Sequence, residues 1–182
     1  MTYLEEYNYL IQGRHVIAGY WIKKEVENLI EDLQNPAYIY DTAEAHKRIK
    51  FMQSLCLQSK HPYFGKPLEL MPYQLAFWEA LYGFKMSDTQ LRRFTEALLE
   101  IARKNFKTFT IAVLFILLFL LEPKFSKFFS VAPDGTISRE VKSAITEILK
   151  SSPAVYEFKN RPRFKILRDY IEFIPKESRF IP

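Results

Sequence analysis

A Lys-Thr pair stands at the junction of two apolar segments near the middle of the chain. The segment Phe94–Ile101 is short and mostly apolar, as expected of a buried strand, and Phe109–Leu121 is almost wholly apolar and compatible with a helix. Lys107 and Thr108 precede that helix. At such a junction, backbone N–H groups bind phosphate, a lysine reaches the β/γ oxygens and a hydroxyl ligates Mg²⁺. The pair therefore predicts a nucleotide-phosphate site; the alternative is an ordinary basic turn.

Phe106 departs from the pattern of a phosphate-binding loop. Such loops place a glycine before the lysine, because the backbone must approach the phosphate closely, often at dihedral angles that disfavour a β-carbon. A phenylalanine here would occlude the phosphate site or force the loop into another path. Either the nucleotide is held loosely or this chain has lost the activity.

Blocks of similar sequence also point to a known family. In chain order they are Gly19–Glu25, Tyr38–Asp41, Ala45–Phe51, Gly65–Gln74, Leu91–Phe94, Arg103–Thr108 and Phe128–Ala132. Their order and spacing resemble the N-terminal part of the phage terminase large subunit, the motor that pumps DNA into procapsids. The family's loop reads Arg-Lys-Asn-Gly-Lys-Ser/Thr, which maps onto residues 103–108 with one mismatch, at Phe106.

The resemblance implies roles for the loop residues. Lys104, Asn105, Lys107 and Thr108 would bind ATP, and the Thr108 hydroxyl would complete the Mg²⁺ shell. Arg103 would act catalytically on transition-state charge, as an arginine finger does in cis. The alternative for Arg103 and Lys104 is that both side chains are solvated.

Gln74, which follows Pro72 and Tyr73, stands in a position that resembles the adenine-contacting glutamine of terminases and related motor ATPases. Its amide can both donate to and accept from the adenine edge; the alternative is a partly exposed residue on an amphipathic helix. In the family, an acidic strand motif and the nuclease acids lie further along the chain, whereas no apolar run here ends in paired acids. We therefore expect a truncated N-terminal portion, an expressed fragment or a prophage remnant, that is inactive as an ATPase by itself.

The composition is that of a globular, mildly basic protein. The 182 residues are 48% hydrophobic, and the net charge is +5, which is compatible with nucleic acid but is more often a solvated surface. The single cysteine, Cys56, excludes an internal disulfide and fits a reducing cytosol. The run 109–121 is shorter than the roughly 20 residues that span a bilayer. We therefore expect a buried helix there, no signal peptide and a location in the bacterial cytoplasm.

The expected fold is α/β: a helical N-terminal region over residues 1–90, followed over residues 91–182 by an incomplete P-loop NTPase-type parallel sheet flanked by helices. Helices are expected over most of 3–34 in two segments, 42–57, 72–82, 107–121 and 136–150. Strands are expected at 94–102, 126–132, 165–167 and 170–174. The alternation of strand and helix after residue 92 favours a parallel sheet.

The leading functional hypothesis is an N-terminal portion of a DNA-packaging terminase large subunit with a degenerate phosphate-binding loop, using ATP and Mg²⁺. The resemblance implies double-stranded DNA, the portal protein and the small terminase subunit as partners, and a homo-oligomer when full length. The alternatives are a non-catalytic prophage remnant, a nucleic-acid or partner-binding module that keeps the motor fold, and a helical membrane-associated protein built around residues 109–121.

Overall fold

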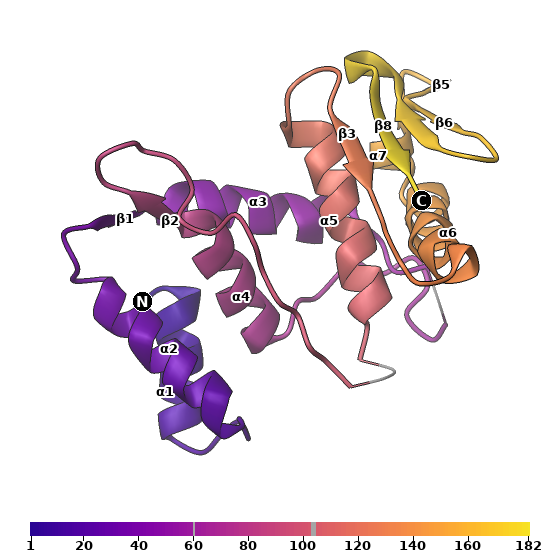
Figure 1. Cartoon of the computed structure of the whole chain (residues 1–182). Helices are drawn as coiled ribbons and strands as arrows, with labels where there is room; N and C mark the ends of the chain where they lie inside the picture. The colour runs from indigo at the N-terminus through magenta and orange to yellow at the C-terminus, as the bar shows by residue number, and fades with distance from the viewer. Residues whose placement is uncertain (60, 103–104) are drawn as a thin grey trace. The chain divides into compact units, whose positions relative to one another are not determined.

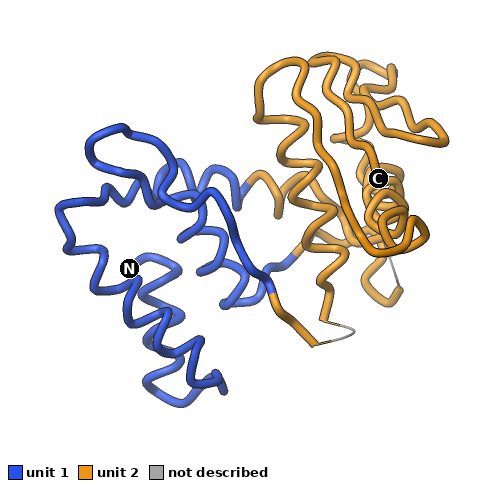
Figure 2. Tube along the Cα trace, viewed as in Figure 1, with its two compact units in different colours: residues 1–50, 69–99 blue, residues 51–68, 100–182 orange. Residues whose placement is uncertain are grey.

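The computed structural model describes residues 1–59, 61–102 and 105–182 (Figure 1). The chain divides into two compact units (Figure 2). The first comprises residues 1–50 and 69–99, and the second comprises residues 51–68 and 100–182. The expected division of the chain at residues 90 and 91 stays a prediction.

The first unit is mostly helical. Its elements are α1 (Tyr3–Gln12), α2 (Tyr20–Asp32), β1 (Tyr38–Tyr40), α3 (Thr42–Leu55, whose last turn enters the second unit), α4 (Pro72–Gly83) and β2 (Phe84–Met86). Helix α1 begins with a capping box: the Thr2 hydroxyl accepts from the Glu5 N–H (3.1 Å), and the Glu5 carboxylate accepts from the Thr2 N–H (2.6 Å). Apolar side chains of α1, α2 and α4 form a shared core, closed by Phe84 of the antiparallel β1–β2 ribbon. The expected helices of this region are confirmed.

A buried carboxylate ties the first unit together. Glu79 of α4 is completely buried. Its carboxylate accepts hydrogen bonds from the Leu4 N–H (2.8 Å) and the Tyr40 hydroxyl (2.9 Å), and pairs with the half-exposed His46 side chain of α3. Burial, followed by the adjacent Glu79 charge, raises the pKa of Tyr40. One carboxylate thus links α1, β1, α3 and α4.

The second unit combines helices with a mixed sheet (Figure 1). Its elements are α5 (Lys107–Leu121), β3 (Lys127–Phe129), α6 (Gly135–Ser151), α7 (Pro153–Tyr156), β4 (Glu157–Phe158), β5 (Arg161–Pro162), β6 (Phe164–Ile166), β7 (Ile171–Phe173), the 3₁₀ turn η1 (Ile174–Lys176) and β8 (Ser178–Ile181). The sheet order is β3-β8-β7-β6, and β4 pairs with β5 in a separate hairpin. The expected helices at 107–121 and 136–150 and the strands near 127, 165 and 171 are confirmed.

Helix α5 supplies the core of the second unit. It packs along α6 and against β8, and Phe119 is completely buried. The Phe119 ring contacts Phe128, Phe164 and Phe173 of the sheet, with ring centroids 5.3, 5.5 and 6.3 Å away. The expected burial of this apolar helix is confirmed. No helix in the described part of the chain is long and apolar enough to cross a membrane.

Two expectations about the sheet are wrong. Residues 94–102 do not form the expected strand, and their side chains are largely exposed, with Leu98 87% accessible. A strand needs a neighbour for its backbone N–H and C=O groups, and the described residues give this segment none. The sheet is also not parallel throughout: β3 pairs parallel with β8, but β7 is antiparallel to both β6 and β8. The α/β class is confirmed, with a mixed sheet.

Candidate functional site

The loop before α5 adopts a backbone conformation that favours glycine. Phe106, the N-cap residue of α5, has φ = 57° and ψ = 18°, in the left-handed region. For a residue with a β-carbon this conformation costs roughly 1–2 kcal/mol. The Phe106 carbonyl accepts from the backbone N–H (2.8 Å) and the hydroxyl (2.9 Å) of Thr110, which fixes the first turn of the helix. Phe106 therefore keeps the conformation that a glycine adopts most easily.

Lys107 and Thr108 open α5, and both are exposed. The first N–H groups of a helix have no intrahelical partner, and the helix dipole makes this end favourable for an anion. No acidic residue stands in the first turn of α5 to occupy that end. The Asn105 amide donates to the Ala102 carbonyl (3.3 Å), so this side chain braces the loop.

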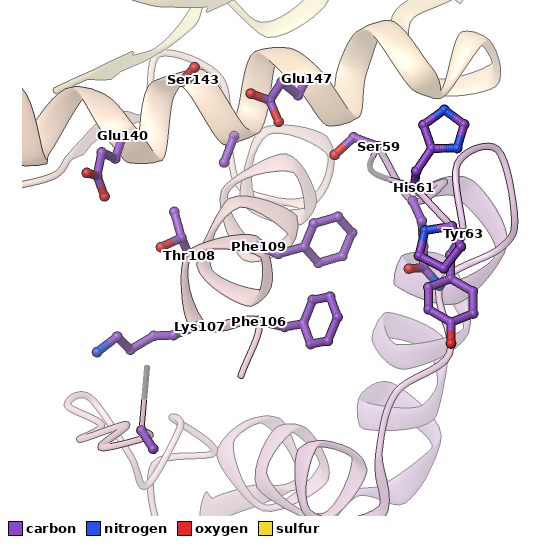
Figure 3. Close-up of a pocket in the computed structure, with 14 residues that line it drawn as sticks. Ser59, His61, Tyr63, Phe106, Lys107, Thr108, Phe109, Glu140, Ser143 and Glu147 are labelled. Carbon is purple, nitrogen blue, oxygen red and sulfur yellow. The ribbon is translucent and has the colours of Figure 1, made fainter. Parts of the chain in front are cut away.

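A pocket of about 630 Å³ lies beside this helix start, within the second unit. Its walls come from the start of α5, from α6 and from residues 58, 59 and 61–63. Figure 3 shows Phe106 and Phe109 directed toward His61 and Tyr63, whereas Lys107 points the opposite way. The Phe106 ring therefore does not cover Lys107, and the phenylalanine leaves the cationic side of the pocket open.

Helix α6 brings polar groups that the sequence analysis did not single out. Glu140, Ser143 and Glu147 line the pocket opposite the start of α5 (Figure 3). They recur along one face of α6 because residues at i, i+3 and i+7 share a helix face. That periodicity is visible in the sequence, but it does not reveal what the face opposes. Among the described residues, no three His, Cys, Asp or Glu side chains gather as a metal site.

The predicted site residues are only partly brought together. Lys107 and Thr108 both line the pocket, and Asn105 lies directly before them. Arg103 and Lys104 lie outside the described residues. His61 also lines the pocket. No sequence pattern predicted this, because His61 has no partner at metal-ligand spacing along the chain.

Gln74 belongs to the first unit. Its side chain is buried, and its amide oxygen accepts from the Met71 N–H (2.9 Å) at the start of α4. The amide therefore caps its own helix. Pro72 begins that helix, where a residue without an N–H is tolerated.

Comparison with known proteins identifies the class. The family model "Terminase large subunit, ATPase domain" matches residues 72–177, which is more than half of the chain. The chain therefore belongs to the terminase large subunit family, and the resemblance seen in the sequence is confirmed.

A solved structure shares the fold. The crystal structure of the HK97 bacteriophage large terminase matches with a TM-score of 0.61 at 20% sequence identity, covering 75% of this chain and 26% of that one. The chain thus spans about a quarter of the length of that terminase. None of the curated proteins matches.

Proposed function

We propose that this chain is the nucleotide-binding part of a phage DNA-packaging motor, and that the start of α5 holds the phosphates of ATP. The supporting observation is the left-handed Phe106 followed by Lys107 and Thr108, at a helix start that opens onto a pocket of about 630 Å³. This volume lies in the range of roughly 300–1,000 Å³ usual for ligand pockets.

Each residue of the loop has a role in this proposal. The Lys107 ammonium contacts the terminal phosphates, and the first backbone N–H groups of α5 donate to the phosphate oxygens. Asn105 holds the loop in shape through its bond to Ala102 (3.3 Å). By family resemblance, Lys104 adds charge near the phosphates and Arg103 acts on the transition state. Gln74 is the proposed adenine contact, also by family resemblance.

The oxygen atoms that line the pocket fit Mg²⁺ only when a bound nucleotide supplies further oxygen ligands. Mg²⁺ usually keeps several waters and takes one or two protein oxygens together with substrate phosphates. The Thr108 hydroxyl would hold it, with the Glu140 carboxylate of α6 as a second oxygen lining the same pocket. Bound there, the ion would neutralise phosphate charge.

We further propose that the chain by itself hydrolyses ATP negligibly. None of the strands described in the second unit ends in an acidic residue: β3, which follows α5, ends at Phe129. In such ATPases an acidic residue at the end of a strand helps to hold Mg²⁺ and to position the attacking water; Glu140 lies within α6 and does not replace it in that role.

We infer the wider role from family membership. In the complete motor, the proposed partners are double-stranded DNA, the portal protein and the small terminase subunit, in a homo-oligomer working in the bacterial host cytoplasm.

Titration calorimetry of the chain with ATP and Mg²⁺ tests the binding proposal. A charge-assisted hydrogen bond contributes about 1.5–3 kcal/mol, so Lys107→Ala should weaken ATP binding by roughly tenfold or more. Lys124→Ala, which removes a lysine near the other end of α5, is the matched control. Equal affinities of the wild type and Lys107→Ala would refute the placement of the phosphates. Phosphate release well above that of Lys107→Ala would refute the claim of negligible hydrolysis.

A further inference from the structure

We propose that the Thr110 hydroxyl is a positioning group for the phosphate site, because it holds the first turn of α5 in place against the strained backbone of Phe106. The inference rests on the proposed function, since it takes the phosphates to lie at the start of α5. Thr110 does not touch the nucleotide in this proposal and acts only through the backbone of residue 106. It explains how the start of α5 keeps its order with a phenylalanine where the family has glycine.

The peptide group between Phe106 and Lys107 joins the loop to the phosphate site. Because a peptide group is planar and trans, its C=O and N–H point in opposite directions. The Phe106 carbonyl points along α5 and accepts from the Thr110 N–H at 2.8 Å. The Lys107 N–H therefore points out of the helix start, toward the proposed phosphates. This donor keeps its direction only while the carbonyl stays bonded to Thr110.

Thr110 holds that carbonyl through two hydrogen bonds. A carbonyl oxygen has two lone pairs, and the Thr110 hydroxyl donates to the Phe106 oxygen at 2.9 Å beside the bond from the N–H. Thr110 is 4% exposed, and a hydrogen bond inside a protein is electrostatically stronger than one in water. Unwinding of the first turn of α5 therefore breaks two hydrogen bonds instead of one.

The left-handed backbone of Phe106 favours such unwinding. Phe106 has φ = 57°, a conformation that glycine adopts without steric cost but that disfavours a residue with a β-carbon. If the first turn unwound, Phe106 could return to a negative φ. The N-cap residues of α1, α2, α4 and α6 have extended backbone instead, so the first turns of these helices carry no comparable strain.

The alternative is that the hydroxyl bond of Thr110 is an ordinary feature of a helix. Threonine side chains can bond the carbonyl four residues earlier without any further role. Thr146 does so in α6, where its hydroxyl donates to the Lys142 carbonyl at 2.9 Å. That bond lies in the interior of a 17-residue helix, whereas the acceptor of Thr110 is the N-cap residue itself. Thr146 is therefore the matched control.

Two measurements on variants of the full chain test this role. Valine keeps the shape of threonine and removes the hydroxyl, so Thr110→Val is compared with Thr146→Val. Phe106→Gly removes the conformational cost at residue 106, and the double variant Phe106→Gly/Thr110→Val shows whether the hydroxyl still matters without that cost. Calorimetry with ATP and Mg²⁺ measures binding, and amide hydrogen exchange followed by NMR measures local opening of the turn at residue 110.

The expected result is a loss that depends on Phe106. Thr110→Val should weaken ATP binding roughly three- to tenfold and speed exchange of the residue 110 amide by a similar factor. Thr146→Val should change ATP affinity by less than about twofold. With glycine at position 106, the loss caused by Thr110→Val should fall below about twofold, because glycine stays left-handed without a second bond.

Four outcomes would overturn the proposal: an unchanged ATP affinity in Thr110→Val, an equal loss in Thr146→Val, the same loss with glycine at position 106, or unchanged exchange at residue 110. Failure of the proposed function looks different. If the wild type binds no ATP, both proposals fall. If Lys107→Ala leaves the affinity unchanged while Thr110→Val still weakens it, the contact of Lys107 with phosphate is refuted and the role of Thr110 stands.

Discussion

Replacing Glu79 by alanine should be the most damaging single change in the first unit. The Glu79 carboxylate is completely buried and accepts from the Leu4 N–H (2.8 Å) and the Tyr40 hydroxyl (2.9 Å) while pairing with His46. The substitution leaves two donors without an acceptor and opens a cavity between α1 and α4. The His46 side chain is 43% exposed, so water can replace its lost partner.

The magnitude follows from those contacts. An orphaned buried donor costs about 1–3 kcal/mol, and Glu79→Ala leaves two donors without an acceptor, the Leu4 N–H and the Tyr40 hydroxyl. We expect the substitution to lower the free energy of unfolding by about 2–6 kcal/mol, a large part of the roughly 5–15 kcal/mol of a typical domain. Glu79→Gln keeps one acceptor oxygen and should cost about 1–2 kcal/mol.

Urea denaturation followed by tryptophan fluorescence measures this change directly. Trp78, which is 1% exposed, neighbours Glu79 in α4 and reports on this unit. Glu27→Ala is the control, because Glu27 is exposed and accepts from the exposed Gln12 amide at 3.4 Å; it should change stability by less than about 0.5 kcal/mol. A loss below about 1 kcal/mol in Glu79→Ala would refute the view that this carboxylate holds the helices together.

Three further predictions follow from buried groups. Burial raises the pKa of the Cys56 thiol to about 12, so Cys56 should resist iodoacetamide in the native protein at pH 8 and react once urea unfolds it; rapid native alkylation would contradict its burial. The pKa of a cysteine in an unfolded chain is about 8.5. The buried thiol therefore contributes stability that is intact below that pH and is lost as the pH rises toward 12. Urea titrations at several pH values should show this decline in the wild type and not in Cys56→Ala. The pKa of Tyr40 is likewise raised, so stability should fall above about pH 10, and less steeply in Tyr40→Phe; identical slopes would refute the assignment. Phe119→Ala should cost about 3–5 kcal/mol, visible as a lower melting temperature by circular dichroism, whereas Phe129→Ala, at an exposed position, should cost little.

Local sequence was enough to predict most helices of this protein. Helix α5 ends where the apolar run predicted, because Pro123 disfavours helical backbone at Glu122 before it. It begins at Lys107, as predicted. The strands near residues 165 and 171 followed from short apolar runs. These features depend on neighbours along the chain, which the sequence displays directly.

The segment 94–101 shows where local sequence failed. Its apolar residues suggested a buried strand, but strand formation depends on a partner elsewhere in the chain, and sequence periodicity carries no information about that partner. The same limit applies to the antiparallel pairing of β7, which the alternation of strands and helices did not predict.

For the candidate site too, some features were predictable from local sequence and others depended on the tertiary structure. Lys107, Thr108 and the unusual Phe106 were recognisable from residue types and order alone, as was the need for a glycine-like backbone at residue 106. Only the tertiary structure decided that Phe106 adopts this backbone with its ring turned away from Lys107, and that Glu140, His61 and Tyr63 face the same pocket. The backbone requirement is local to the loop, whereas the pocket walls are assembled from segments far apart in the sequence, and only packing brings them together.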